Sequence, residues 1–308
     1  MARPLDARVD EALRSVGCAV TVDSRTGRGC RWHLAIANGA VMPVRASLSS
    51  GWLDLTAALP QASLRRVDDV SALRLNMNLP GSSRIARLFG DRQPHVRADV
   101  HVRHVEDLAG WVQTACSSFS DAAHRLADGR EDEVDMSVVK EPSAADIEVE
   151  RICRELGWPV SSDAGPGVRI ELTTRVGAFS ARVASSPDVP RAFVADLLDL
   201  EHQSATCLRA VAALLLAVSG SMRSVKGGIV RRAAGATAVL VSPLSAPLEQ
   251  SAGEALSALA AAWQFTGREV QALLDERLAA EYLARSVGFD DRRAGESIHQ
   301  QEEQTCLQ

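Results

Sequence analysis

The sequence predicts an α+β protein of two tandem domains, in each of which helices pack on an antiparallel sheet. Three observations lead to this prediction. The chain repeats itself once, and both copies show the same order of helical and strand periodicities. A length of 308 residues with 46% hydrophobic content also suffices for two cores of the usual domain size.

The repeat begins with an amphipathic helix at the start of each copy. Positions 9–20 recur as positions 149–160, with apolar residues at i, i+3, i+4 and i+7 and a glycine after each helix. A period of about 140 residues is as long as a domain, so it indicates tandem domains rather than a solenoid. The matching positions are Val9, Ala12, Leu13, Val16, Gly17, Trp32, Leu34, Gly39, Ala40, Gly81 and Arg84, which recur as Val149, Ile152, Cys153, Leu156, Gly157, Ile170, Leu172, Gly177, Ala178, Gly220 and Arg223.

A strand hairpin is predicted to follow the opening helix in each copy. In the first copy, residues 30–36 alternate, Asn38-Gly39 suits a tight turn, and 41–48 form the second strand. In the second copy the corresponding segments are 168–172, a turn at Gly177, and 179–183. Third strands are expected near 52–55 and 191–194. Pro43 lacks a backbone donor, which favours an edge or bulged position for its strand.

The remaining elements complete the order α-β-β-β-α-β-β-α in both copies. Helices are predicted at 67–79 and 204–218, closed by Pro80-Gly81 and Ser219-Gly220. Strands follow at 85–89 and 96–104, and at 229–232 and 237–242. Each copy ends in a helix, 105–126 or 249–262. A further helix is expected to begin at Thr266, because Thr266 and Glu269 have the spacing of a capping box.

These elements divide the chain into residues 1–128 and 147–286 as the two domains. Residues 129–146 are acidic, contain proline and serine and lack periodicity, which is typical of a solvated linker. Residues 287–308 are polar with little to bury, and we expect a disordered tail.

Composition excludes several classes of function. The two halves are close to neutral and the chain has a single tyrosine, so neither the basic stripe nor the stacking aromatics of a nucleic-acid-binding protein are present. The longest apolar run, 210–218, is far shorter than the ~20 residues that span a bilayer, and no signal region opens the chain. We therefore expect that the protein does not associate with a membrane and that it is cytoplasmic. The six cysteines form no C-x-x-C pair, which favours reduced thiols packed in the cores.

No set of reactive or metal-ligating residues converges in the sequence, so no cofactor, metal or catalytic residue is predicted. His101 and His104 lie an odd number of residues apart on a predicted strand and should face opposite sides of the sheet, and His95 is far along it. Cys30 and His33 are also an odd number of residues apart on a strand, so their side chains should lie on opposite faces, which argues against a Cys-His nucleophile. Residues 221–228 contain glycines and a lysine but not in phosphate-loop order, which favours a helix-to-strand turn.

Residues 72–112 carry a resemblance to a known superfamily. The features are Leu73-x-Leu75-Asn76 at a helix end, Leu79-Pro80, a charged turn at 90–92, and the alternating strand around Val96, Val100 and Val102, followed by a helix with Leu108 and Val112. The segment resembles type III secretion chaperones (Tir chaperone, CesT-like) and YbjN-like domains over residues 5–126. In the second half Asn76 and the Leu-Pro pair have no counterpart. The resemblance implies a non-enzymatic domain that pairs with a second copy and holds an extended, unfolded segment of another protein. With both copies in one chain, it implies a built-in pseudodimer, monomeric or weakly homodimeric.

The predicted function is accordingly a protein-binding, chaperone-like role without catalysis, in which an extended segment of a secreted or toxic effector or other client adds to a sheet edge. The strands 41–48 and 179–183 are the predicted edges. The alternatives are a regulatory or structural scaffold that uses its acidic linker and tail and, third, a hydrolytic enzyme. For Trp32, packing under a helix is the alternative to binding. The candidate partner-binding residues are Trp32, Leu34, Ile36, Val44, Trp52, Ile170, Leu172, Phe179 and Ala181.

Overall fold

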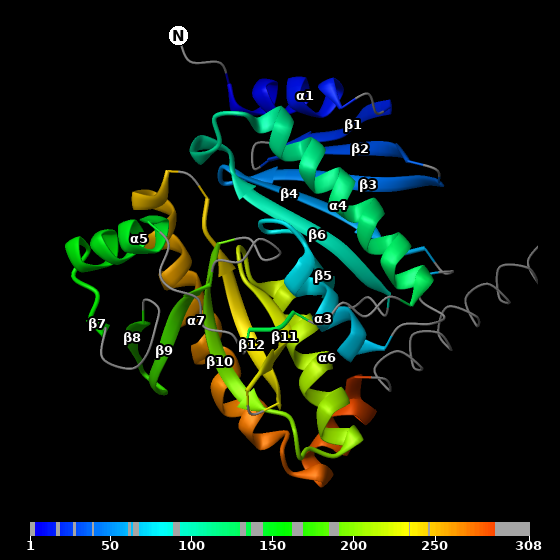
Figure 1. Ribbon diagram of the computed structural model, residues 1–308. Coiled ribbons are helices and arrows are strands. Elements are labelled where there is room, and N and C mark those ends of the chain that lie inside the picture. The colour runs from blue at the N-terminus through cyan, green and yellow to red at the C-terminus, as the bar shows by residue number, and fades with distance from the viewer. Residues whose placement is uncertain are drawn as a thin grey trace, which may run out of the picture.

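A computed structural model describes residues 4–16, 19–26, 29–38, 40–60, 63, 68–88, 93–129, 134–136, 144–161, 169–184, 191–233, 235–245 and 247–286. It contains two six-stranded sheets, each antiparallel throughout (Figure 1). The prediction of an α+β fold with antiparallel sheets is confirmed.

Both sheets have the same strand order. The first runs β1-β2-β3-β4-β6-β5 and the second β7-β8-β9-β10-β12-β11. In each sheet the strand that follows the helical crossover therefore lies at the end, and the last strand is inserted beside the fourth. The first-sheet strands are β1 (Ala19–Thr26), β2 (Gly29–Asn38), β3 (Ala40–Ser49), β4 (Trp52–Ala58), β5 (Arg84–Arg87) and β6 (Pro94–His101), and the second-sheet strands are β7 (Val160–Ser161), β8 (Arg169–Thr174), β9 (Gly177–Ala184), β10 (Ala192–Asp199), β11 (Lys226–Arg232) and β12 (Gly235–Pro243).

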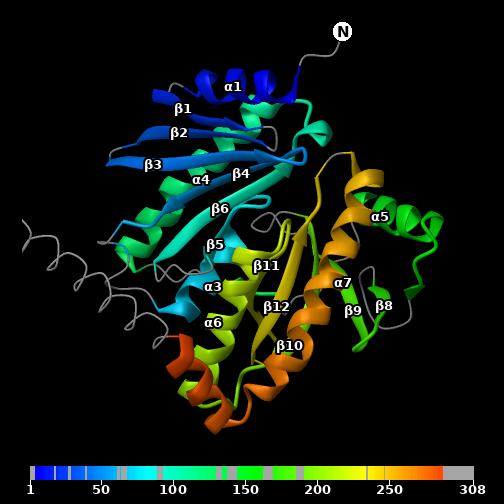
Figure 2. The ribbon, with the colours of Figure 1, turned by 180° about the vertical axis from the view of Figure 1, so that it is seen from behind.

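Helices cover one face of each sheet. On the first, α1 (Leu5–Ser15) packs against α4 (Leu108–Asp128), and α4 runs across β6. On the second, α5 (Ala144–Glu155) packs against α7 (Leu248–Ala272), and α7 lies on β8, β10 and β12 (Figure 2). The apolar face predicted for the opening helices is buried at Val9, Leu13, Val149 and Ile152. Leu156 is an exception, because it is 50% exposed at the end of α5.

The two halves contact each other reciprocally. Helix α3 (Asp69–Asn78) belongs to the first half but packs on β11 of the second, and α6 (Ala205–Ser221) of the second half packs on β5 of the first. The two helices also pack on each other between the sheets (Figures 1 and 2). The strand at the end of each sheet, β5 or β11, is thus flanked by a helix from the other half.

The observed elements differ from the predicted ones in three details. Each half has an additional strand before the predicted hairpin, β1 or β7. The strand predicted at 96–104 ends at His101 and continues as a 3-10 helix, η1 (Val102–His104). The additional helix expected to begin at Thr266 begins instead at Glu276, because α7 continues to Ala272. Thr266 is fully buried and its hydroxyl donates to the Ala262 carbonyl, so it acts inside the helix rather than as a cap.

A tight turn connects β3 to β4. The turn between β3 and β4 consists of Ser50 and Gly51, with φ of 52° and 81°. Two consecutive positive φ values suit the right-handed twist of a two-residue hairpin. Gly51 also lies under a neighbouring ring, since a Cβ there would lie 2.8 Å from Nε2 of His101. This turn sets Trp52 directly opposite His101 in the β4–β6 pairing.

Part of the predicted linker belongs to the folded structure. Residues 134–136 lie beside β11, where Arg231 donates its amide to the Val134 carbonyl and accepts from the Met136 amide. Val134 is 8% exposed and packs in the smaller apolar cluster with Met77 and Val230. These residues are therefore not solvated linker. The predicted tail, 287–308, lies outside the described residues.

Candidate functional site

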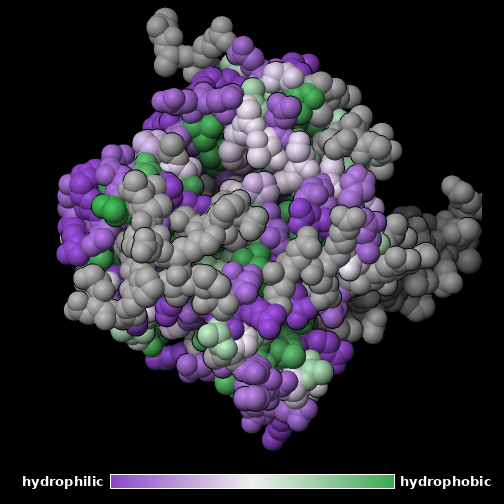
Figure 3. Space-filling view, viewed as in Figure 1, coloured by the Kyte–Doolittle hydropathy of each residue, from purple (hydrophilic) through white to green (hydrophobic). Residues whose placement is uncertain are grey.

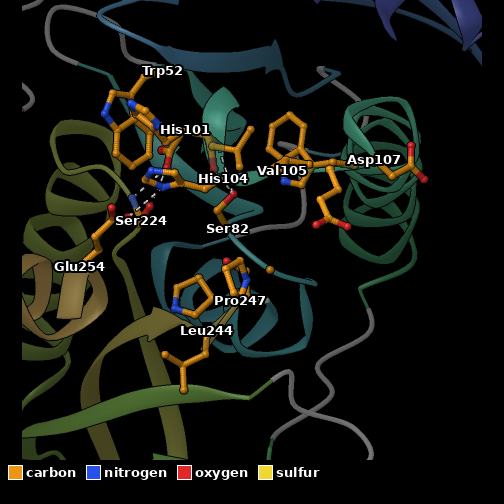
Figure 4. A pocket seen from close by; sticks show the side chains of 17 residues that line it. Trp52, Ser82, His101, His104, Val105, Asp107, Ser224, Leu244, Pro247 and Glu254 are labelled. Atoms are coloured by element: carbon orange, nitrogen blue, oxygen red, sulfur yellow. Dashed lines mark hydrogen bonds and ion pairs between the residues drawn. The ribbon is translucent and has the colours of Figure 1, made fainter. Parts of the chain in front are cut away.

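A pocket of about 490 Å³ lies at the junction of the two halves (Figure 4). We call it the inter-half pocket. The first half supplies its walls from β4, β6, η1 and the start of α4, and the second half from the turns at 224 and 243–247 and from α7. Its lining residues are Trp52, Gly81, Ser82, Asp99, Val100, His101, His104, Val105, Glu106, Asp107, Trp111, Ser224, Pro243, Leu244, Ser245, Pro247 and Glu254.

His101 and His104 are the central titratable pair of this pocket. Their ring centroids are 4.3 Å apart, so the prediction that they face opposite sides of a sheet was wrong. The reason is η1: side chains three residues apart on a 3-10 helix lie above one another, whereas on a strand they diverge. His95 lies elsewhere, beside a smaller pocket on the outer side of the first sheet.

The hydrogen bonds of His104 fix its orientation. Its Nδ1 lies 3.3 Å from Oε2 of Glu254, and its Nε2 lies 2.8 Å from Nε2 of Gln250, both on α7 of the other half. With the Gln250 amide as donor, Nε2 of His104 accepts and Nδ1 carries the hydrogen toward Glu254. Both ring nitrogens are then occupied by protein groups. His104 therefore links the halves rather than presenting a free base to the pocket.

His101 lies in a more apolar setting. Burial lowers the pKa of His101, and the adjacent His104 lowers it further. The edge contact with the Trp52 ring, at 5.3 Å between centroids, contributes to this packing. Its Nδ1 is buried without a hydrogen-bond partner among the described residues. A neutral imidazole accommodates this environment better than an imidazolium, because desolvation disfavours the charged form.

A buried ion pair joins Asp99, which lines the pocket, to Arg84. The guanidinium of Arg84 and the carboxylate of Asp99 are both fully buried and pair directly. Arg84 also donates to the carbonyls of Ser219 and Met222 at 2.7 and 2.8 Å, and Asp99 accepts from the Ser224 amide at 2.8 Å. The pair is thus completed by backbone groups of the other half. Burial lowers the pKa of Arg84 while Asp99 raises it, and arginine remains charged in such pairs.

A second buried cation, Lys226, crosses the same interface. It is 3% exposed and donates from Nζ to the Leu79 carbonyl at 2.7 Å. Burial, with a smaller contribution from Arg84, lowers its pKa to about 7. Asn76 lies nearby in α3 and donates from one amide nitrogen to the carbonyls of Ile85 and Gly227 at 3.1 and 3.0 Å. Asn76 is one of the residues on which the resemblance to secretion chaperones rests, and it joins β5 to β11.

Two of the three serine hydroxyls of the pocket, those of Ser82 and Ser224, are engaged in structural hydrogen bonds. Ser82 donates to the Asp99 carbonyl at 2.5 Å, and Ser224 lies 3.3 Å from the Asp99 carboxylate. No histidine hydrogen bond to either serine is present among the described residues. The arrangement consequently lacks the nucleophile–base contact of covalent catalysis. Within the described ranges, no group of three His, Cys, Asp or Glu residues is placed to hold a metal ion.

Seven of the nine predicted binding residues belong to the cores. Trp32 lies beneath α1 and donates from its indole nitrogen to Asp10 at 3.1 Å, as expected for the packing alternative. Because these seven side chains are buried, they cannot form an open binding surface. The side chain of Ile36 lies outside the described part of the chain, and only Trp52 lines the inter-half pocket. The seven buried residues are Trp32, Leu34, Val44, Ile170, Leu172, Phe179 and Ala181.

The predicted sheet edges were also wrong. β3 lies between β2 and β4, and β9 lies between β8 and β10, so both strands are paired on two sides. Ala181 is opposite Ile170 on one side and Ala195 on the other, which leaves no room for an added strand. Pro43 is accommodated because it pairs with Ala35 in β2, one residue beyond the point where the β3–β4 pairing begins at Val44.

Some of the pocket residues carried no usable signal in the sequence. Glu254 and Gln250 lie on a polar helix face that looks like any solvated face, and Trp111 looks like one more core position. The spacing of His101 and His104 was visible in the sequence. A 3-10 turn after the strand brings residues i and i+3 together, so this spacing was the available signal.

Residues 221–228 form the helix-to-strand turn expected for them, between the end of α6 and Lys226 of β11. Four cysteines, Cys30, Cys116, Cys153 and Cys207, are buried free thiols. Burial raises the pKa of the Cys153 thiol to about 11, which keeps it protonated.

In the described part of the chain, none of the helices is long and apolar enough to cross a membrane. Comparisons with protein-family models, with curated proteins and with solved structures give no significant match, so the chain is assigned to no family.

Proposed function

We propose that this protein is a non-catalytic, chaperone-like binding protein that holds a segment of a partner protein in the inter-half pocket. The observation that carries the proposal is the composition of this pocket. Both halves line it, it contains two tryptophans, and the hydroxyls of Ser82 and Ser224 and the ring of His104 are already bonded to protein groups. Such a site can bind a partner, and none of its described serines is hydrogen-bonded to a histidine that would activate it.

We further propose that the two halves form an intramolecular pseudodimer. Two observations support this arrangement: the identical strand orders, and the reciprocal packing of α3 on β11 and of α6 on β5. A self-complementary contact of this kind is what a two-fold symmetric dimer of single domains would make. The secretion-chaperone resemblance agrees with such a pairing and remains a proposal.

The pocket is a better candidate for the binding surface than an apolar sheet face. On the side seen in Figure 3, the described side chains are mainly hydrophilic and the hydrophobic ones form small separate groups. The apolar strand residues that were predicted to bind are in the cores. A concave site with aromatic walls concentrates binding energy where a flat polar surface does not.

The proposal is tested by blocking the pocket mouth. Ser245 is exposed at the rim, and Ser245→Trp should obstruct the pocket without altering the core. Ser117→Trp, at an exposed position of α4 that does not line the pocket, is the matched control. A partner captured from an extract of the source cells by the unaltered chain should be retained by Ser117→Trp and lost by Ser245→Trp. Equal capture by both variants would refute a role for the pocket.

The same assay distinguishes binding in the inter-half pocket from the scaffold alternative, in which the acidic linker and tail make the contacts. If the tail carries the contacts, a chain ending at residue 286 should lose the partner while Ser245→Trp keeps it. We expect the reverse, because the described part of the linker is packed against β11 rather than free for contacts.

A further inference from the structure

We propose that the inter-half pocket recognises a cationic side chain of its partner, specifically the guanidinium of an arginine. The partner part of this inference rests on the proposed function. The chemical part rests on the charge and the aromatic walls of the pocket, and can be tested without a partner.

The charges of the lining are unbalanced. Asp99, Glu106, Asp107 and Glu254 line the pocket, and none of its described lining residues is a lysine or arginine. Of these four, Asp99 is neutralised by Arg84. The remaining three carboxylates belong to exposed residues and leave an excess of negative charge around the pocket, which attracts a cation.

The three remaining acids lack a full counter-charge. Glu254 meets His104, whose ring is a counter-charge only when it is protonated. Asp107 accepts from the Gly110 amide as the N-cap of α4. Neither Glu106 nor Asp107 has an ion-pair partner among the described residues. Their oxygens are therefore available to an incoming donor.

The aromatic walls suit a planar cation. Trp52 already holds one: the Arg223 guanidinium lies 5.2 Å from its ring centroid, and Asp54 is 3.7 Å from the same arginine. This is an arginine between an indole and a carboxylate, within the same region of the protein. Trp111 has no such partner in the described part of the chain, although it lines the pocket together with Glu106 and Asp107. A second arginine, from the partner, would repeat the arrangement at Trp111.

The size of the pocket favours a side chain over a simple ion. A volume of about 490 Å³ far exceeds one ion, and Val105, Pro243 and Leu244 give apolar walls for the methylene stem of an arginine. A guanidinium also donates in one plane to two carboxylates while stacking on an indole, which an ammonium does not.

The first test uses the intact chain labelled with 5-fluorotryptophan and followed by fluorine NMR. N-acetyl-arginine amide is titrated against N-acetyl-citrulline amide, which has the same shape without the charge. We expect a saturable shift of the Trp111 resonance with the arginine probe, in the millimolar range, and none with citrulline. The Trp32 resonance should not move, since its ring is fully buried and bonded to Asp10. Equal shifts with both probes, or no saturable shift at Trp111, would overturn the inference.

The second test removes the charges. Glu106→Gln combined with Glu254→Gln should weaken the arginine probe by roughly tenfold, because the contact with Glu106 becomes neutral and the pocket loses a second negative charge. Glu276→Gln, an exposed substitution outside the pocket, is the control and should leave the affinity unchanged. Circular dichroism establishes that each variant is folded. Unchanged affinity in a folded double variant would contradict the assignment of these carboxylates.

The two proposals fail differently. If the arginine probe binds but Ser245→Trp retains the partner, the pocket is a cation site and the proposed function is wrong. If Ser245→Trp loses the partner while the double glutamine variant keeps it and the arginine probe fails, the function stands and the arginine inference is wrong.

Discussion

At the scale of single residues, the most consequential feature is the cluster of buried charges where the halves meet. Arg84 and Asp99 belong to the first half and Lys226 to the second, and each is hydrogen-bonded to a backbone group more than 100 residues away, across the interface. Buried charges of this kind contribute little net stability when paired, but they strongly penalise an arrangement in which a partner is missing. We infer that they enforce the register between the halves.

The pair Arg84–Asp99 gives a first prediction. Asp99→Asn should destabilise the protein by about 3 to 5 kcal/mol, because the fully buried guanidinium loses its counter-charge. The double variant Arg84→Met/Asp99→Leu should be clearly less destabilised than the sum of the two single changes. Denaturant unfolding of the unaltered protein, Arg84→Met, Asp99→Leu and the double variant measures this coupling. Additive effects would mean that the two charges do not act as a pair.

Lys226 gives a second prediction, on pH dependence. Its pKa is lowered from 10.5 to about 7 in the folded protein, so between these values the unfolded chain binds the additional proton. Stability from this residue therefore rises with pH across that window, by up to about 1.4 kcal/mol per pH unit, and is lowest below pH 7.

In Lys226→Met this contribution is absent. The difference in unfolding free energy, variant minus unaltered protein, should therefore fall steadily as the pH rises from neutral toward the ordinary lysine value. Using the difference cancels other titrating groups, such as Tyr282. A difference that is independent of pH would show that Lys226 keeps an ordinary pKa.

At the scale of elements, the interface depends on glycines in and beside α6. A Cβ at Gly220 would overlap the backbone carbonyl oxygen of Arg87 in β5, and one at Gly228 would overlap the Met77 side chain of α3. The overlap at Gly220 is with backbone, which cannot rotate away. The close approach of α6 to β5 therefore requires glycine.

A pair of matched substitutions tests this. Gly220→Ala should destabilise the protein by roughly 1 to 3 kcal/mol, since the strain exceeds the gain in helix propensity. Gly253→Ala in α7 is the control: its Cβ would meet only Leu156 Cδ1 at 3.6 Å. There the helix should gain about 0.5 to 1 kcal/mol. Thermal unfolding compares the two, and stabilisation by both would show that α6 does not approach β5 this closely.

At the scale of the whole molecule, each half appends its crossover helix to the other half's sheet. In an isolated first half, the surfaces of α3 and β5 that contact β11 and α6 would be exposed. Apolar residues such as Met77 and Ile85 would then be open to solvent or to a second copy.

The corresponding prediction is that the intact chain is a monomer near 32.9 kDa, whereas residues 1–128 alone self-associate or aggregate. Light scattering coupled to size-exclusion chromatography measures both species. A well-behaved monomeric first half would contradict the pseudodimer proposal.

The sequence by itself determined the local and repeated features of this protein. Amphipathic periodicity marked the opening helices around Val9 and Val149, and turn chemistry marked the hairpin between β2 and β3, because both signals arise from contacts within a few residues. The duplication itself was readable, since matched positions such as Leu34 and Leu172 occupy equivalent strands, β2 and β8.

Only the tertiary structure decided which strands lie at edges and which residues meet. Alternating apolar residues look the same in β3 and β9 whether the strand is central or at an edge, so Pro43 and Ala181 gave no usable indication of strand order. His104 and Glu254, or Asp99 and Ser224, are brought together by the packing of one half on the other. The physical reason is that pairing across the interface depends on the joint burial of distant segments, which no local pattern of residue types encodes.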